Sequence, residues 1–174
     1  MSEAQWTEQT RQERQFYDGV YHRQDDLTSR LAEPLSVREV YALALLGARR
    51  GNLVLDVGSG SGRHAVEIGR RGAVVLAVDI ALKGLEQGRA LAQLAGQAQQ
   101  VCNVSMDAHR LALADQSVDL VFGAQVLHHL DCAQAGAEIG RVLRPGGRAV
   151  FIENSDRNPV LRWARRHLMG RFGI

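Results

Sequence analysis

The chain has 174 residues, 45% of them apolar and 23% charged, and a formal net charge of +2 at pH 7. These values are typical of one soluble domain with a real core, and the small net charge gives no argument for a nucleic-acid partner. The longest apolar runs, of about six residues, are far shorter than the roughly 18 of a membrane span. Because Met1–Gln5 lacks the features of a signal peptide, we expect a cytoplasmic protein that does not contact a membrane.

The two cysteines, Cys102 and Cys132, are far apart in the sequence and show no metal-ligand spacing. We therefore expect two buried thiols rather than a disulfide, and no metal site.

The first 35 residues are predicted to form a helical arm or lid, followed by a domain in residues 36–174. Residues 1–33 are polar and charged with a few aromatic side chains, and Pro34 is expected to end the arm. Ser36 and Glu39 then have the spacing of a capping box, which opens another helix. Gly51 is expected to close that helix beside the first strand. Its predicted buried face consists of Val37, Val40, Tyr41, Ala44, Leu45 and Ala48.

The stretch from Leu53 to His64 predicts a buried strand, a tight turn and the start of a helix. Leu53–Val57 is an apolar run containing one acid, as in a parallel strand covered on both faces. Gly58, Gly60 and Gly62 follow at every second position, where glycine allows positive φ or lets a ligand approach bare backbone. The pattern predicts a nucleotide-type site at the end of a central strand. A glycine-rich turn without a ligand is the alternative.

Strands and helices alternate through the rest of the chain. Further helices are expected at about residues 63–71, 82–94 and 131–143, and strands at 73–79, 100–104, 118–122 and 148–153. Arg144–Gly147 is predicted to be a turn, and residues 157–174 a basic helix. Because crossovers between parallel strands are right-handed, this alternation predicts an α/β fold, a doubly wound Rossmann-like parallel sheet with helices on both faces.

Four stretches together resemble the class I S-adenosylmethionine-dependent methyltransferases, specifically the small-molecule, type 11 (UbiE-like) branch. They are Asp56–Gly62, Asp79, Met106–Ala108 with the strand that follows at 117–121, and Val126–Leu130 leading to Arg141–Gly147. The resemblance covers roughly residues 40 to 153. It implies strand order 3-2-1-4-5, S-adenosylmethionine as the cofactor, and in-line methyl transfer to a small-molecule substrate. A dinucleotide fingerprint would instead need glycine at position 63, which is arginine here.

The resemblance also implies which residues contact the methionine part and the ribose of the cofactor. The glycine loop, including Ser59, would let the methionine part lie on exposed amides, with Asp56 below it to orient the loop or a water that faces the ammonium group. Asp79 would accept hydrogen bonds from the ribose hydroxyls. That contact suits the ribose of NAD equally, so Asp79 does not discriminate between the two cofactors.

The adenine side of the predicted site is more specific. Within Met106–Ala108, Asp107 resembles the family's acceptor for the adenine amino group, although a turn or helix cap is the structural alternative. Ile80 would press on one face of the base. Gln125 lies where the family meets the ammonium group of the cofactor or the substrate.

No catalytic dyad is evident from the sequence. His128, His129 and Tyr17 are only weak catalytic candidates. The family carries the histidine pair chiefly as packing and helix-cap residues rather than as general bases. Tyr17 and Tyr21 in the arm resemble the family's lid, whose rings can cover a sulfonium methyl group. Packing of these rings in the core is an equal alternative.

Two other functions stay open: an NAD-dependent oxidoreductase, and a cofactor-binding module with little turnover. Family members commonly finish the sheet with an antiparallel strand pair that this sequence lacks. We therefore expect a C-terminally truncated chain, or an exposed edge at Ala149–Glu153 that a partner or a second copy of the chain covers as a homodimer.

Overall fold

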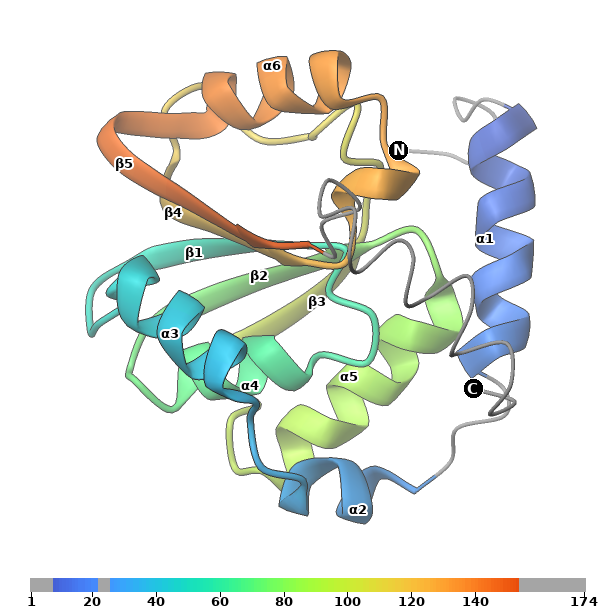
Figure 1. Ribbon diagram of the computed structural model, residues 1–174, viewed down its shortest axis with the longest axis vertical. Helices are drawn as coiled ribbons and strands as arrows, with labels where there is room; N and C mark the ends of the chain where they lie inside the picture. The colour runs from blue at the N-terminus through green and yellow to red at the C-terminus, as the bar shows by residue number, and fades with distance from the viewer. Residues whose placement is uncertain (1–7, 22–25, 154–174) are drawn as a thin grey trace, which may run out of the picture.

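The computed structural model describes residues 8–21 and 26–153. Its centre is a single sheet of five parallel strands in the order β3-β2-β1-β4-β5, shown in Figure 1, which confirms the predicted α/β fold and strand order. The strands are β1 (Leu53–Val57), β2 (Val74–Asp79), β3 (Val101–Ser105), β4 (Val118–Ala124) and β5 (Leu143–Ile152). The expected basic helix at 157–174 lies outside the described residues.

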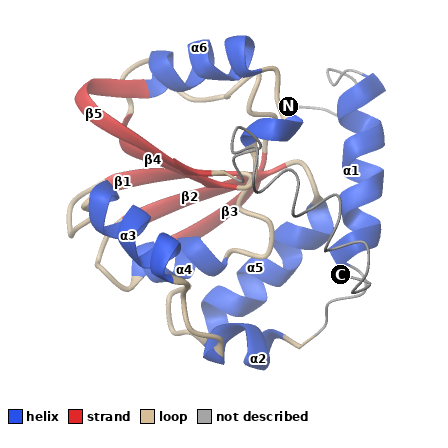
Figure 2. Cartoon of the chain, viewed as in Figure 1, coloured by secondary structure: helices blue, strands red, loops and turns tan. Residues whose placement is uncertain are grey.

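Helices cover both faces of the sheet (Figure 2). On one face lie α3 (Val37–Leu46), α4 (Arg63–Gly69) and α5 (Leu82–Leu94), and on the other lies α6 (Cys132–Val142). Neighbouring residues of β1 point to opposite faces, so Val54 belongs to the first core and Leu55 to the second. Because both faces of β1 are buried, the apolar run in the sequence correctly predicted a central strand.

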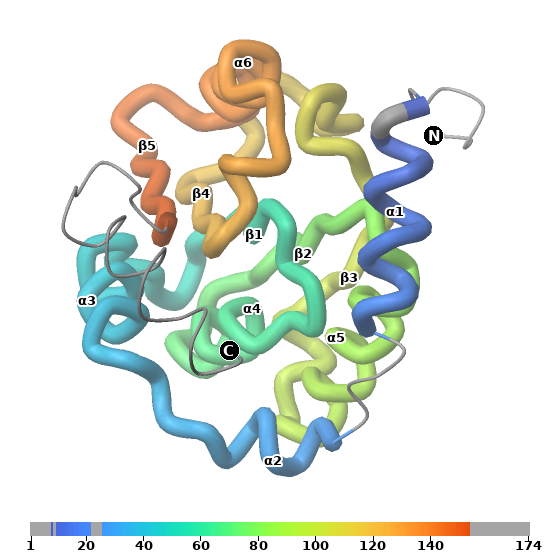
Figure 3. The backbone as a smooth tube through the Cα atoms, turned by 45° about the vertical axis from the view of Figure 1, so that its right-hand side comes forward, coloured from blue at the N-terminus to red at the C-terminus, as the bar shows by residue number. Residues whose placement is uncertain are grey.

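The predicted arm contains two described helices, α1 (Glu8–Tyr21) and α2 (Leu27–Ala32). Asp26 caps the start of α2 by accepting a hydrogen bond from the Ser29 amide. Figure 3 shows α1 lying beside α5 and crossing the edge of the sheet where the strands end. This position places α1 over the loops that follow β1, β2, β3 and β4.

The capping box of α3 is confirmed, but the predicted buried face of this helix is wrong. Ala42, Leu43 and Leu46 are buried, and the helix packs mainly against β5 rather than β1. The residues that were expected inside and are exposed are Val37, Val40, Tyr41, Ala44 and Leu45, whereas Ala48, just past the end of the helix, is buried as predicted. The helix is apolar on nearly all sides, so periodicity alone does not select one face.

The end of α3 and the start of β5 also differ from the predictions. Gly47, in the left-handed conformation, caps α3 in place of Gly51. Arg144–Gly147 does not separate α6 from a later strand, because β5 already begins at Leu143. The predicted turn residues form an irregularity within β5: Leu143 to Arg148 lies opposite only Val118 to Leu120 of β4.

Both cysteines are exposed free thiols, so the prediction of two buried thiols is wrong. Cys102 lies in β3, an outer strand of the sheet, and Cys132 is the first residue of α6. Neither position is enclosed by a second layer. Within the described residues, no helix is both long and apolar enough to cross a membrane.

Candidate functional site

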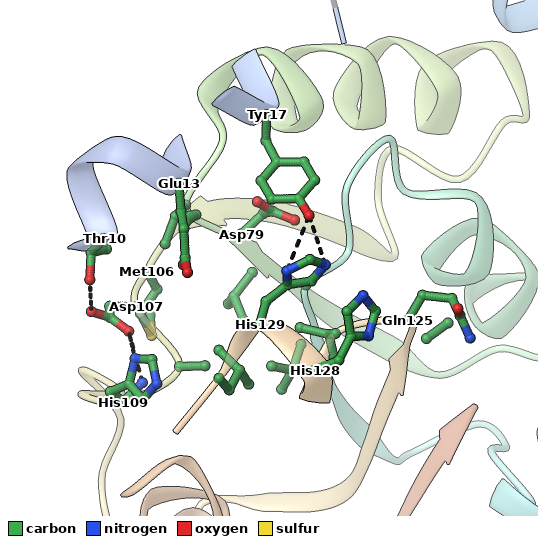
Figure 4. A pocket seen from close by; sticks show the side chains of 18 of the residues that line it. Thr10, Glu13, Tyr17, Asp79, Met106, Asp107, His109, Gln125, His128 and His129 are labelled. Carbon is green, nitrogen blue, oxygen red and sulfur yellow. Dashed lines mark hydrogen bonds and ion pairs between the residues drawn. The ribbon is translucent and has the colours of Figure 1, made fainter. Parts of the chain in front are cut away.

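A cavity of about 380 Å³ opens at the carboxyl ends of the strands, beneath α1 (Figure 4). Its volume lies in the range of small-molecule sites, and its position is where open α/β sheets bind ligands. The lining residues come from α1, from the ends of β1 to β4 and from the loops after them. They are Thr10, Glu13, Tyr17, Tyr21, Val57, Gly58, Val78, Asp79, Ile80, Met106, Asp107, Ala108, His109, Ala124, Gln125, Val126, His128, His129 and Leu130.

The predicted cofactor residues divide into two groups. Seven line the cavity: Gly58, Asp79, Ile80, Met106, Asp107, Ala108 and Gln125. Asp56, Ser59, Gly60 and Gly62 are not among the lining residues and lie in or under the glycine loop. The two carboxylates from the ends of β2 and β3 therefore share one cavity, as the predicted site requires.

Asp79 ends β2 and is held by the backbone around it. Its two carboxylate oxygens accept hydrogen bonds from the amides of Gly60 and Ala81, each at 2.8 Å. Burial raises the pKa of the Asp79 carboxyl, although these amide hydrogen bonds act in the opposite direction. The carboxylate thus joins the glycine loop to the start of α5 and orients one wall of the cavity.

Asp107 follows β3 and is 6% exposed. One of its oxygens accepts hydrogen bonds from the His109 amide at 2.9 Å and from the His109 ring at 2.7 Å. Because the Asp131 amide donates to Nε2 of His109, the ring proton sits on Nδ1 and points to Asp107. The other oxygen accepts from the Thr10 hydroxyl at 3.3 Å, so α1 contacts this carboxylate directly (Figure 4).

The glycine loop is packed closely against the rest of the chain. Gly58 and Gly60 have positive φ, and an added Cβ would lie 2.4 Å from the Val126 side chain and 2.3 Å from the Tyr21 hydroxyl, respectively. The amides of Ser59, Gly60 and Gly62 donate hydrogen bonds within the chain, to Val78 O, the Asp79 carboxylate and Ser59 O. These amides therefore shape the loop, whereas the resemblance had implied amides exposed to a ligand.

Asp56 is buried beneath the loop, and its Oδ2 has no hydrogen-bond partner among the described residues. Burial, followed by the nearby charge of Asp79, raises the pKa of the Asp56 carboxyl to about 8. A protonated Asp56 at neutral pH is compatible with the predicted role of supporting the loop.

One face of α1 forms the lid side of the cavity. Thr10, Glu13, Tyr17 and Tyr21 recur at helical spacing and all line the cavity. Tyr21 packs against Gly60 and Gly84, and burial, then the charge of Asp79, raises the pKa of its phenol to about 12. The sequence had singled out both tyrosines but missed Thr10 and Glu13. The missed signal is a polar stripe at helical spacing, which an apolar-periodicity search does not detect.

Two further contacts hold α1 in place. The Asp18 carboxylate accepts a hydrogen bond from the Lys83 amide at 2.8 Å, in the first turn of α5. It therefore serves as a cap that α5 does not provide for itself. The side-chain amide of Gln87 donates to the Tyr21 carbonyl at 2.6 Å.

The two neighbouring histidines have different surroundings. The Tyr17 hydroxyl lies 2.7 Å from Nε2 of His129, so this pair bridges α1 and the loop after β4 (Figure 4). Burial, and then the neighbouring His128, lower the pKa of His129 and favour its neutral form. His128 instead pairs with Glu153 at 2.9 Å. Of the two, His129 is the better placed to act on a molecule in the cavity.

Glu153 and Gln125 organise the loop after β4. Glu153, which sequence reasoning did not select, accepts hydrogen bonds from the amides of Val126 and Leu127 at 2.7 and 2.8 Å. Gln125 has positive φ, and both its backbone and side-chain amides donate to the Ile152 carbonyl. These contacts tie the loop to the end of β5, and a carboxylate at the end of a predicted strand was the available signal.

Comparisons with known proteins agree with this fold. Residues 55–151 match the methyltransferase domain family, and this is more than half of the chain. An uncharacterized methyltransferase of Mycobacterium tuberculosis is 38% identical over 122 residues, which cover 69% of this chain and 47% of the relative. A demethylmenaquinone methyltransferase of Mycolicibacterium paratuberculosis is 34% identical over 166 residues, covering 92% of this chain and 67% of the relative.

Solved structures give the same result. A geranyl diphosphate methyltransferase in complex with S-adenosylmethionine matches with a TM-score of 0.62 and 25% identity, over 66% of this chain and 47% of the other. The chain therefore belongs to the methyltransferase domain family, and its resemblance to the class I S-adenosylmethionine-dependent enzymes is confirmed. It spans about half the length of the first curated relatives that it matches.

Proposed function

We propose that this chain binds S-adenosylmethionine in the cavity beneath α1 and transfers the methyl group to a small-molecule acceptor. The observation that carries the proposal is the charge of the cavity. Asp79, Asp107 and Glu13 line it, whereas no lysine or arginine is among the described residues that do so. An anionic cavity suits a ligand with sulfonium and ammonium groups and disfavours the pyrophosphate of NAD.

In this proposal, Asp79 accepts hydrogen bonds from the ribose hydroxyls and Asp107 from the adenine amino group. Ile80, Met106 and Ala108 supply the apolar surface against the base. Gly58 and Gln125 border the methionine part. Asp56, Ser59, Gly60 and Gly62 act indirectly, because they maintain the shape of the loop that presents Gly58 and holds Asp79.

The proposed mechanism needs little covalent chemistry from the protein. When bound, S-adenosylmethionine supplies a methyl group already activated by its sulfonium. The chain orients the acceptor in line with that methyl group and excludes water, so the rate enhancement comes from proximity and orientation. Tyr17 and Tyr21 would form the lid, and a neutral His129 could accept a proton from a hydroxyl acceptor, with Tyr17 positioning its ring.

Isothermal titration calorimetry tests the cofactor assignment. S-adenosylmethionine and its demethylated product should both release or absorb heat, whereas NADH should give none. Asp107→Ala should weaken binding of S-adenosylmethionine by about 10- to 100-fold, the effect of losing a hydrogen bond to a charged group. The matched control is Asp115→Ala, because Asp115 is exposed and lies outside the cavity. Absence of heat with the folded wild-type chain would refute the proposal, and binding without methyl transfer would favour a cofactor-binding module.

The acceptor is proposed to be a small organic molecule and not a nucleic acid, which the anionic cavity would repel. The name of one relative, demethylmenaquinone methyltransferase, supports this class of acceptor. A screen of metabolite extracts with methyl-labelled cofactor tests it directly. Transfer of label to added DNA or RNA, and to no small molecule, would contradict the assignment.

We further propose that a partner or a second copy covers the outer edge of β5. Among the described strands, β5 has a neighbour on one side only, and α3 beside it exposes Val37, Val40, Tyr41 and Leu45. An open edge next to an apolar surface is a liability for an isolated chain. Mass measurement in solution tests self-association. The cytoplasmic location and the division into an arm and a domain stay predictions.

A further inference from the structure

The charge of the cavity differs from the charge of the whole chain. The chain carries 21 lysine and arginine residues against 19 aspartate and glutamate residues. The described lining nevertheless contains three carboxylates and neither of the two permanently basic residue types. The cavity therefore has a local charge that opposes the net charge of the chain.

Glu13 differs from the other two carboxylates in its origin. Asp79 and Asp107 follow strands of the sheet and accept several hydrogen bonds from nearby amides and side chains. Glu13 comes from α1, on the face that also carries Thr10 and Tyr17. Figure 4 shows its side chain directed into the cavity between these two residues.

The electrostatic influence of Glu13 reaches across the cavity. Burial is the main cause that raises the pKa of Tyr17, and the charge of Glu13 raises it further. For His129, burial lowers the pKa, and the charge of Glu13 opposes this effect without reversing it. These two groups form the bridge between α1 and the loop after β4. A positive charge placed in this part of the cavity would therefore experience the field of Glu13 in a partly desolvated setting.

We propose that Glu13 is a specificity-determining residue that favours S-adenosylmethionine over its demethylated product by attracting the positive sulfonium. This inference rests on the proposed function. The two ligands differ by one methyl group and one positive charge, so their contacts to ribose, adenine and the amino-acid part cancel in a comparison. A carboxylate in the wall lowers the free energy of the charged ligand alone. It would thereby favour release of the product after transfer.

The test measures both dissociation constants by calorimetry for the wild-type chain and for Glu13→Gln. The affinity for S-adenosylmethionine should fall by roughly tenfold, while the affinity for the demethylated product should change by less than about twofold. Sinefungin carries a protonated amine in place of the sulfonium, so its affinity should fall in Glu13→Gln by about as much as that of S-adenosylmethionine. Glu13→Asp keeps the charge and should retain most of the preference.

The matched control is Glu8→Gln, on the same helix, where the side chain is 72% exposed and pairs with Arg11. This variant should leave both affinities unchanged. If Glu13→Gln lowered the affinity for charged and uncharged ligands equally, the proposal would be overturned, because Glu13 would then act by holding α1 in place. Unchanged affinities for both ligands in Glu13→Gln would overturn the proposal as well. If neither ligand binds to the wild-type chain, the proposed function itself fails, which is a distinguishable result.

Discussion

The two helices α1 and α3 use their faces in opposite ways. The inner face of α1 carries Thr10, Glu13, Tyr17 and Tyr21, all with polar atoms, and covers the cavity. The outer face of α3 carries large apolar residues and is open to solvent in the described part of the chain. The expectation of apolar residues inside fails for α1, and the expectation of polar residues outside fails for α3. We infer that α1 faces a ligand and that α3 faces a partner, so each exception indicates a binding surface.

The largest expected effect on stability concerns Glu39, at the N-terminal end of α3. It tests whether contacts at this end hold the helix on the domain. Burial alone would raise the pKa of Glu39, but hydrogen bonds from Ser36 and His64 lower it from 4.5 to about 2. A carboxyl whose pKa is lower in the folded state stabilises the fold above its unfolded pKa and loses this contribution as the pH falls. We expect a loss of about 3 kcal/mol in the free energy of unfolding between pH 4.5 and pH 2.

Urea unfolding at a series of pH values measures this effect. Glu39→Gln should be less stable than the wild type at pH 7 and should show a flatter pH dependence below pH 4.5. Glu86→Gln is the control, because Glu86 lies in an exposed ion pair with Lys83. A wild-type profile that parallels that of Glu39→Gln would contradict the assignment.

The next effect tests whether the inner face of α1 is packed onto the domain. Tyr21→Ala removes a ring that lies against Gly60 and Gly84. We expect a loss of about 2 kcal/mol in the free energy of unfolding, together with weaker cofactor binding. Phe16→Ala on the same helix, where the ring is 66% exposed, should change stability by less than about 0.5 kcal/mol. Equal effects of the two substitutions would show that α1 has no preferred inner face.

A smaller effect is expected at the bridge between α1 and His129. Tyr17→Phe removes only the hydroxyl that lies 2.7 Å from Nε2 of His129. We expect the free energy of unfolding to fall by about 1 kcal/mol, the net contribution of one hydrogen bond. A double-mutant cycle with His129→Ala measures the coupling of the two side chains. A coupling energy of zero would mean that the hydroxyl does not hold α1 over the cavity.

The smallest effect on stability is expected on the outer face of α3. Tyr41→Ser replaces a side chain that is 65% exposed, so the free energy of unfolding of the monomer should change by less than about 0.5 kcal/mol. If this face and the β5 edge associate with a second copy, the same substitution should lower the mass observed in solution. Arg38→Ser, also exposed on α3, is the control. A dimer that both variants leave intact would place the contact elsewhere.

Much of the central domain could be predicted because its signals are local. The strand at Leu53–Val57 and the helix at Leu82–Leu94 agree with the prediction to the residue. Apolar runs covered on both faces, separated by glycine turns and helices, leave few alternatives to a parallel sheet. Asp79 could be selected because it ends a predicted parallel strand, and such ends meet at one edge of the sheet. Asp107 was selected through the family resemblance.

The errors and omissions arise where local patterns do not discriminate. Both faces of α3 are apolar, so only its packing against β5 decides which one is buried. The exposure of Cys102 and Cys132 depends on how far the second layer of the fold extends. Glu13 looks like any charged residue of a surface helix until α1 is placed over the cavity.

The sequence by itself determined the class of fold, because the alternation of strands and helices depends on neighbours along the chain and the crossovers on chirality. Its resemblance to a known family implied the order of the strands and the two carboxylates at the strand ends. Only the tertiary structure decided which face of each helix is covered, which loop amides are already paired, and which charges share the cavity. These features depend on contacts between residues far apart in the chain, such as Thr10 with Asp107 and Tyr17 with His129.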